Sequence, residues 1–139
     1  MTYTNEQLSG IYRRTSGYCH ICYKKLAFKN YASYGSKGAW EVEHSNPQAK
    51  GGTNRLNNLY PACISCNRSK GATSTYSARA VNGKVCAPLT PTKRKEEKVG
   101  SAVVGGAAGA VIGIIFGPPG ILLGCLLGAH LGYQKNPDI

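Results

Sequence analysis

Acidic residues are scarce in this chain. Its 139 residues include 17 Lys and Arg but 6 Asp and Glu, which gives a net charge of +11. So few acids exclude a strongly anionic surface. Residues 1–98 hold sixteen of the cations and five of the acids, and therefore carry the whole net charge. A basic surface favours a polyanionic partner, nucleic acid first, although charge that merely keeps a protein soluble has the same composition.

Charged residues are missing altogether from residues 99–133, a run of 35 positions without Lys, Arg, Asp or Glu. This excludes an ordinary solvated linker. Glycine recurs there at every fourth position, at 105, 109, 113 and 117, and again at 120, 124, 128 and 132 after Pro118-Pro119. Such spacing lines glycines along one helix face and favours close helix packing in lipid. It predicts a glycine-zipper α-helical hairpin, with helices at about 100–117 and 120–133.

The length of these two helices leaves their relation to a membrane open. A helix needs about 20 residues to span the hydrocarbon core, which the first nearly has and the second lacks. A re-entrant hairpin, a tilted oligomer, a single bent span and a soluble hairpin buried in an assembly are the alternatives. Because glycine costs about 1 kcal/mol relative to Ala in a helix in water, we expect residues 99–133 to associate with a membrane and with one another.

The N-terminal part contains two Cys-x-x-Cys pairs, Cys19/Cys22 and Cys63/Cys66, separated by forty residues. Two such turns closing a long loop are typical of a structural zinc site with four thiolate ligands. Two disulfides are the alternative. They are disfavoured because Cys-x-x-Cys pairs rarely form structural disulfides and no secretory signal peptide precedes them. We therefore expect Zn²⁺, a reducing compartment and a cytoplasmic N-terminal domain, held at the membrane by the tail.

The remaining secondary-structure patterns and motif residues lie between Trp40 and Gly71. Residues 40–44 alternate as a short half-buried strand, and a loop with a Gly51-Gly52 turn follows. A second short strand is predicted at residues 58–61 and a short helix at about 63–70. This α+β unit would bring Glu43, His44 and Asn67 to one place.

These residues resemble the HNH endonucleases, also called ββα-metal nucleases. The resemblance rests on Glu43-His44, on Asn58 in Asn-Asn-Leu, and on Asn67 directly after the second cysteine pair. It implies a zinc-stabilised ββα domain that hydrolyses phosphodiester bonds of DNA. It also implies that His44 is the general base, that Asn58 braces the loop orienting His44, and that Glu43 and Asn67 hold the catalytic cation.

Two positions depart from the family pattern. Position 43 is Glu where the family more often has Asp, and position 67 is Asn where the family name implies His. A carboxylate and an amide are hard oxygen ligands, which favours Mg²⁺ or Mn²⁺ as the catalytic cation. Four cations are expected to contact the nucleic acid backbone: Lys70, Arg68, Lys50 and Arg55.

The expected organisation has four parts. Residues 1–80 form the HNH nuclease domain, 81–98 a basic linker, 99–133 the glycine-zipper hairpin and 134–139 a polar tail. Two other functions fit the same sequence. One is a zinc-stabilised module that binds nucleic acid without cutting it, and the other is a membrane or assembly protein in which the tail is the active part.

Overall fold

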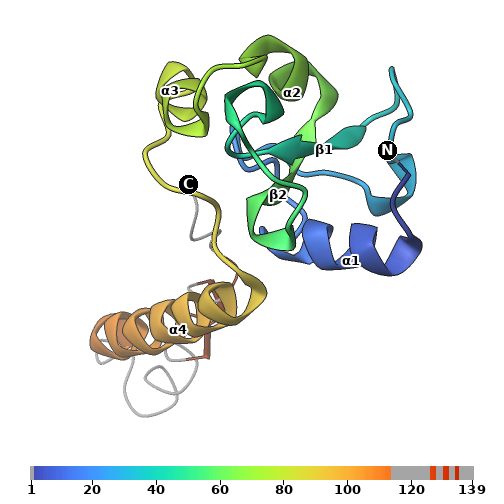
Figure 1. The fold of residues 1–139 in the computed structure, drawn as a ribbon. Coiled ribbons are helices and arrows are strands. Elements are labelled where there is room, and N and C mark those ends of the chain that lie inside the picture. The colour runs from blue at the N-terminus through green and yellow to red at the C-terminus, as the bar shows by residue number, and fades with distance from the viewer. Residues whose placement is uncertain (1, 114–125, 128–129, 132–133, 135–139) are drawn as a thin grey trace. The chain divides into compact units, whose positions relative to one another are not determined.

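The computed structural model describes residues 2–113, 126–127, 130–131 and 134 (Figure 1). It divides into two compact units, residues 1–91 and 92–139. The first unit contains the cysteine pairs and the predicted site. The second contains one long described helix.

The first unit has the predicted order of strand, loop, strand and helix. Strands β1 (Trp40–His44) and β2 (Leu59–Cys63) pair antiparallel, and helix α2 (Ile64–Lys70) follows β2 without a break. The register sets Trp40 opposite Cys63 and His44 opposite Leu59. The described elements, a two-stranded sheet with short helices, confirm a small mixed α/β fold.

Helix α1 (Asn5–Arg13) packs on one side of this sheet and α2 on the other (Figure 1). Trp40 is fully buried and belongs to the same core cluster as Leu8 and Ile11 of α1. Successive strand side chains point to opposite faces, so Glu41 and Glu43 lie on the α2 face. The core therefore fixes which face of β1 carries the two carboxylates.

The loop between the strands has two short 3₁₀ turns, η2 (Gln48–Lys50) and η3 (Leu56–Asn58), and returns close to its own start. At Gly52 the backbone N–H donates to the carbonyl of Pro47 at 3.0 Å. A Cβ added to Gly52 would lie 1.8 Å from the carbonyl oxygen of Asn46. A side chain is thus excluded at this position by contact with backbone.

The region after α2 returns to the first cysteine turn. Helix α3 (Thr75–Val81), capped by Ser74, follows α2, and an irregular segment continues to Pro91. That segment accepts hydrogen bonds from Ser16 Oγ at the Leu89 carbonyl, 3.0 Å, and from the Tyr23 hydroxyl at the Cys86 carbonyl. Residues beyond α2 are therefore part of the first unit.

Helix α4 (Pro91–Gly113) includes the charged residues 93–98 that the sequence assigned to a linker, together with the glycines at 105, 109 and 113. No described helix is both long and apolar enough to cross a membrane. The second helix predicted at 120–133 falls mostly outside the described residues, as do the predicted turn at Pro118-Pro119 and the tail from 135 to 139.

We predict that Gly52→Ala destabilises the first unit by about 1–3 kcal/mol, because the methyl group forces the loop away from Asn46. Gly10→Ala is the matched control, since its added Cβ meets nothing within 4 Å in helix α1. It should stabilise the protein by up to about 1 kcal/mol. Urea unfolding measures both, and equal stabilities would contradict the loop geometry.

Candidate active site and cysteine cluster

Four cysteine side chains from two distant segments meet at one point. Cys19 and Cys22 lie in the turn after α1, and Cys63 and Cys66 lie at the junction of β2 and α2. All four sulfur atoms lie within 4.8 Å of one another, with 3.8 Å between the Sγ atoms of Cys22 and Cys63. Zn–S bonds of about 2.3 Å in a tetrahedron give such a separation, so this donor set fits Zn²⁺. All four are free thiols rather than disulfides.

Close contact splits the pKa values of these thiols. A hydrogen bond with Cys19 lowers the pKa of Cys22. A second hydrogen bond, between Cys19 and Cys63, lowers the pKa of Cys63 to about 7. The pKa of Cys19 is raised by the hydrogen bond with Cys22, and that of Cys66 by the hydrogen bond with Cys19. Protons are thus shared unevenly among neighbours that repel one another as thiolates. A dication bound to all four removes that repulsion, which couples metal binding to folding.

His44 ends strand β1, and its ring is held by the loop. The His44 Nε2 atom lies 2.8 Å from Asn54 Oδ1, which also accepts a hydrogen bond from Gln48 Nε2 at 2.9 Å. Because the shared partner is an acceptor, Nε2 of His44 carries the proton and donates it. The other ring nitrogen, Nδ1, is then unprotonated. A neutral histidine in this tautomer is equipped to take a proton.

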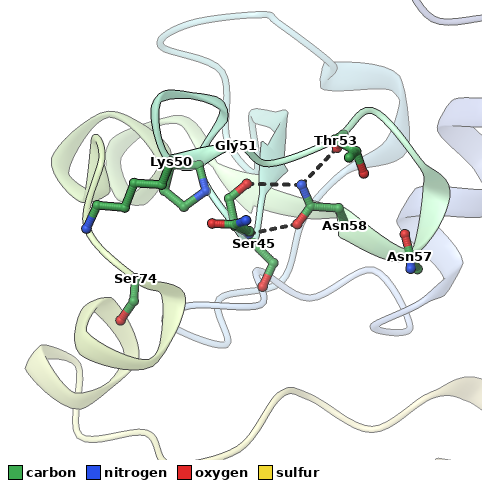
Figure 2. Close-up of a pocket in the computed structure, with 9 residues that line it drawn as sticks. Ser45, Lys50, Gly51, Thr53, Asn57, Asn58 and Ser74 are labelled. Carbon is green, nitrogen blue, oxygen red and sulfur yellow. Dashed lines mark hydrogen bonds between the residues drawn. The ribbon is translucent and has the colours of Figure 1, made fainter.

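Asn58 joins the two ends of the same loop. Its Nδ2 donates to the carbonyl of Asn46 at 3.0 Å and of Thr53 at 2.8 Å, and its Oδ1 accepts from the Asn46 N–H at 2.7 Å. Figure 2 shows these bonds at the edge of a cavity of about 430 Å³. Polar residues dominate its lining, and Lys50 is the one charged residue among them. The cavity begins at Ser45, directly after His44.

Glu41 and Asn67 meet between β1 and the first turn of α2. Asn67 Nδ2 donates to Glu41 Oε2 at 2.9 Å, and Arg68 Nη2 lies 3.4 Å from Glu41 Oε1. The Glu41 side chain is 26% exposed and the Arg68 side chain 60% exposed. An ion pair this open to solvent contributes about 0–1 kcal/mol. Glu41 is therefore a reachable carboxylate whose charged partner is held weakly.

Glu43, the predicted metal ligand, makes different contacts from those expected. It is buried, with Oε1 at 2.7 Å from Lys70 Nζ and Oε2 beside His20 Nε2. Burial opposes its ionisation, but the hydrogen bonds with His20 and Lys70 hold the pKa of Glu43 below its usual value. Removing one partner of such a buried pair costs about 3–5 kcal/mol. The carboxylate in contact with Asn67 is that of Glu41.

His20 connects the first cysteine turn to this buried pair. Arg79 of α3 donates through Nε to the His20 carbonyl at 2.7 Å, and its Nη2 lies 3.1 Å from His20 Nδ1. Arg79 can only donate, so Nδ1 is the acceptor and Nε2–H faces Glu43. Burial lowers the pKa of His20, in agreement with a neutral ring. His20 points to Glu43 and is not among the residues of the cysteine cluster.

The four cations expected to contact phosphate lie in different surroundings. Arg55 and Lys50 are exposed in the loop, and Arg68 is exposed on α2, with its guanidinium 4.9 Å from the centre of the Tyr34 ring. Lys70 is 4% exposed, and its Nζ also lies 3.1 Å from the His44 carbonyl. The Lys70 ammonium thus has internal acceptors and is not presented to a ligand in solvent.

Sequence reasoning missed three residues of this region. Asn54 lies in a polar loop, where nothing distinguishes it from the neighbouring amides. Glu41 could have been found, because it lies two residues before Glu43 and so shares a strand face with it. Arg79 lies beyond the stretch from Trp40 to Gly71 that contains the motif residues, so its contact with His20 had no signal in the sequence.

We predict one zinc ion per chain, bound by the cysteine cluster. Cys63→Ser should lose the metal and the cooperative unfolding of the first unit, because this small domain has few other long-range constraints. Cys86→Ser is the matched control, since Cys86 is an exposed thiol outside the cluster. Metal analysis and thermal unfolding provide the measurements. If Cys63→Ser, with its metal removed by a chelator, unfolds as cooperatively and at the same temperature as the zinc-loaded wild type, the zinc assignment is contradicted.

Comparisons with known proteins agree with this geometry. Searches of curated proteins and of solved structures gave no significant match. Residues 19–73 match the family model described as HNH endonuclease. The matched range begins at the first cysteine and contains β1, the loop, β2 and α2. Residues 19–73 thus match an HNH endonuclease family-model domain and include the four-cysteine cluster.

Proposed function

We propose that the first unit is a metal-dependent endonuclease that hydrolyses phosphodiester bonds of nucleic acid, with DNA as the expected substrate. The observation that carries this proposal is the His44–Asn54 hydrogen bond within a domain that matches the HNH endonuclease model. A base oriented by a third group is the arrangement that general-base catalysis requires.

His44 is the proposed general base. Its Nε2–H is held by Asn54 Oδ1, so Nδ1 is free to accept a proton from the attacking water. Gln48 donates to the same oxygen and keeps it directed as an acceptor. Asn58 fixes the start of the loop after His44, in agreement with the bracing role that the resemblance implies. These bonds orient the base without needing substrate.

Mg²⁺ or Mn²⁺ is the proposed cofactor, held by Asn67 and a carboxylate of strand β1. Such a cation, when bound, neutralises charge on the phosphate and stabilises the departing oxygen. The chain supplies hard oxygen donors on this face, at Glu41 and Asn67, which suit either ion. The resemblance assigns the carboxylate to Glu43.

The nucleic acid backbone is expected to contact the loop between the strands and the exposed Arg68 of α2. Lys50 lines the cavity that begins next to His44, and Arg55 and Arg68 are exposed. Contacts of this type neutralise phosphates without reading bases, so cleavage should depend weakly on sequence and strongly on salt. Lys70 is left out of this surface because it is buried.

Nicking of supercoiled plasmid in Mg²⁺ tests the proposal. His44→Ala should lower the rate by about 100-fold or more, since a positioned base contributes about that factor. His130→Ala is the control, because His130 is an exposed histidine of the second unit. If wild type binds DNA tightly but no metal promotes cleavage, the domain is a binding module and the nuclease proposal fails. Cleavage of RNA alone would correct the substrate.

We further propose that the second unit keeps the domain at the cytoplasmic side of a membrane. Glycines at 105, 109 and 113 recur along helix α4 at four-residue intervals, which places them on one face of that helix. The cations at 93–95 and 98 lie in the first turns of the same helix, where they suit an anionic lipid surface. Self-association along the glycine face would compensate for a helix that is not apolar enough to cross a membrane alone.

Flotation with vesicles that contain anionic lipid tests this second proposal. In high salt the full chain should rise with the vesicles, and a chain ending at Pro91 should remain at the bottom because it lacks the glycine-rich unit. Charge alone would give binding that high salt abolishes, whereas apolar association persists in salt. Absence of the full chain from the vesicle fraction would remove the membrane role and leave the nuclease proposal unaffected.

A further inference from the structure

We infer that Glu41 is the carboxylate that holds the divalent cation together with Asn67, and that Glu43 is a positioning residue for His44. The inference rests on the proposed function, because it names residues of the same site. It departs from the assignment that the family resemblance implies. Four observations on the α2 face of strand β1 support it.

The first observation is the pairing between β1 and α2. Glu41 and Glu43 lie on the same strand face, and each contacts a different turn of α2. Asn67, in the first turn, is 2.9 Å from Glu41, whereas Lys70, in the last, is 2.7 Å from Glu43. Glu41 and Asn67 are therefore already in contact, through the Asn67 amide nitrogen. A flip of that amide would turn its ligating oxygen, Oδ1, toward Glu41 in place of Nδ2.

The second observation concerns the contacts that each acid would lose on binding a cation. Both oxygens of Glu43 have buried partners, one facing Lys70 and one facing His20, and the carboxylate is 2% exposed. A cation there would displace a buried ammonium or lie beside it, with strong repulsion at low dielectric. Glu41 has Arg68 as its charged neighbour, and that side chain can swing into solvent.

The third observation is a series of contacts that connects Glu43 to the backbone of His44. Arg79 holds the His20 ring and carbonyl, and His20 directs its Nε2–H to Glu43. Glu43 in turn fixes Lys70, whose ammonium reaches the carbonyl of His44. The chain of contacts ends on the backbone of the proposed base. Arg79 lies beyond the matched range 19–73, so this support comes from outside the family domain.

The fourth observation is the spacing along β1. Phosphoryl transfer places the attacking and departing oxygens on opposite sides of phosphorus, so the base and the cation need separate positions. Glu41 precedes His44 by three residues of extended strand, about 10 Å between their backbones. Both acids lie on the strand face opposite to His44. They therefore differ in their distance from His44 along the strand, which is larger for Glu41 than for the adjacent Glu43.

The test measures Mn²⁺ binding by electron paramagnetic resonance in the zinc-loaded full chain, without nucleic acid. Glu41→Gln and Asn67→Ala should each weaken Mn²⁺ binding by about tenfold or more, because each removes a ligand. Glu6→Gln is the matched control in α1 and should leave the affinity unchanged. Zinc content and thermal unfolding show whether each variant is folded.

Glu43 needs a variant that does not leave Lys70 buried and unpaired. The double substitution Glu43→Gln with Lys70→Met removes both charges at once and keeps similar side-chain volumes. It should bind Mn²⁺ within about threefold of wild type while lowering kcat with little change in KM, since the base is less well oriented. A ligand role for Glu43 would instead abolish Mn²⁺ binding.

Two results would overturn the inference: loss of Mn²⁺ affinity in the folded double variant with retention in Glu41→Gln, or no Mn²⁺ binding by wild type. Failure of the proposed function looks different. In that case Mn²⁺ still binds and depends on Glu41, but no nucleic acid is cut. Binding and cleavage therefore report separately on the ligand assignment and on catalysis.

Discussion

The meeting of four cysteine side chains from two distant segments is the constraint on which the first unit depends. A dication bound by all four would hold these segments together. The two cysteine pairs enclose forty residues that contain strand β1, the loop and most of β2. A two-stranded sheet is marginal by itself, and the core cluster is small. In the folded chain the cysteine cluster joins the two ends of these forty residues and fixes where α2 begins. The face that α2 presents to β1 follows from that start.

A second constraint is the burial of charge on that face. Glu43 and Lys70 are both nearly inaccessible, and His20 and Arg79 complete their surroundings. Buried ion pairs contribute little net stability, yet they have one arrangement in which every partner is satisfied. The group therefore sets the relative position of the first cysteine turn, β1, α2 and α3. The group also reaches the end of β1, because the Lys70 ammonium lies 3.1 Å from the His44 carbonyl.

Periodicity and motif spacing predicted the order of elements in residues 40–71, because alternation in β1 and the two cysteine pairs are local signals. They did not predict the partner of each side chain. Glu43 and His44 are adjacent in a recognisable motif, but a motif does not reveal that Lys70 and His20 surround the carboxylate. Lys70 was predicted to contact solvent-borne phosphate since lysine is usually exposed, and burial against Glu43 reverses that expectation. The helical state of residues 93–98 was missed because charged runs resemble linkers.

The contacts made by residues 75–90 bear on where the autonomous folding unit ends. The family match stops at residue 73, yet Arg79 grips the histidine between the first two cysteines, and the carbonyls of Cys86 and Leu89 accept bonds from Tyr23 and Ser16. A polypeptide trimmed to the matched boundaries would expose the His20 ring and leave its acceptor nitrogen without a donor. The boundaries of the family match are thus narrower than the segment that folds as one unit. A fragment for expression or fusion should therefore end near Pro91, the first residue of α4.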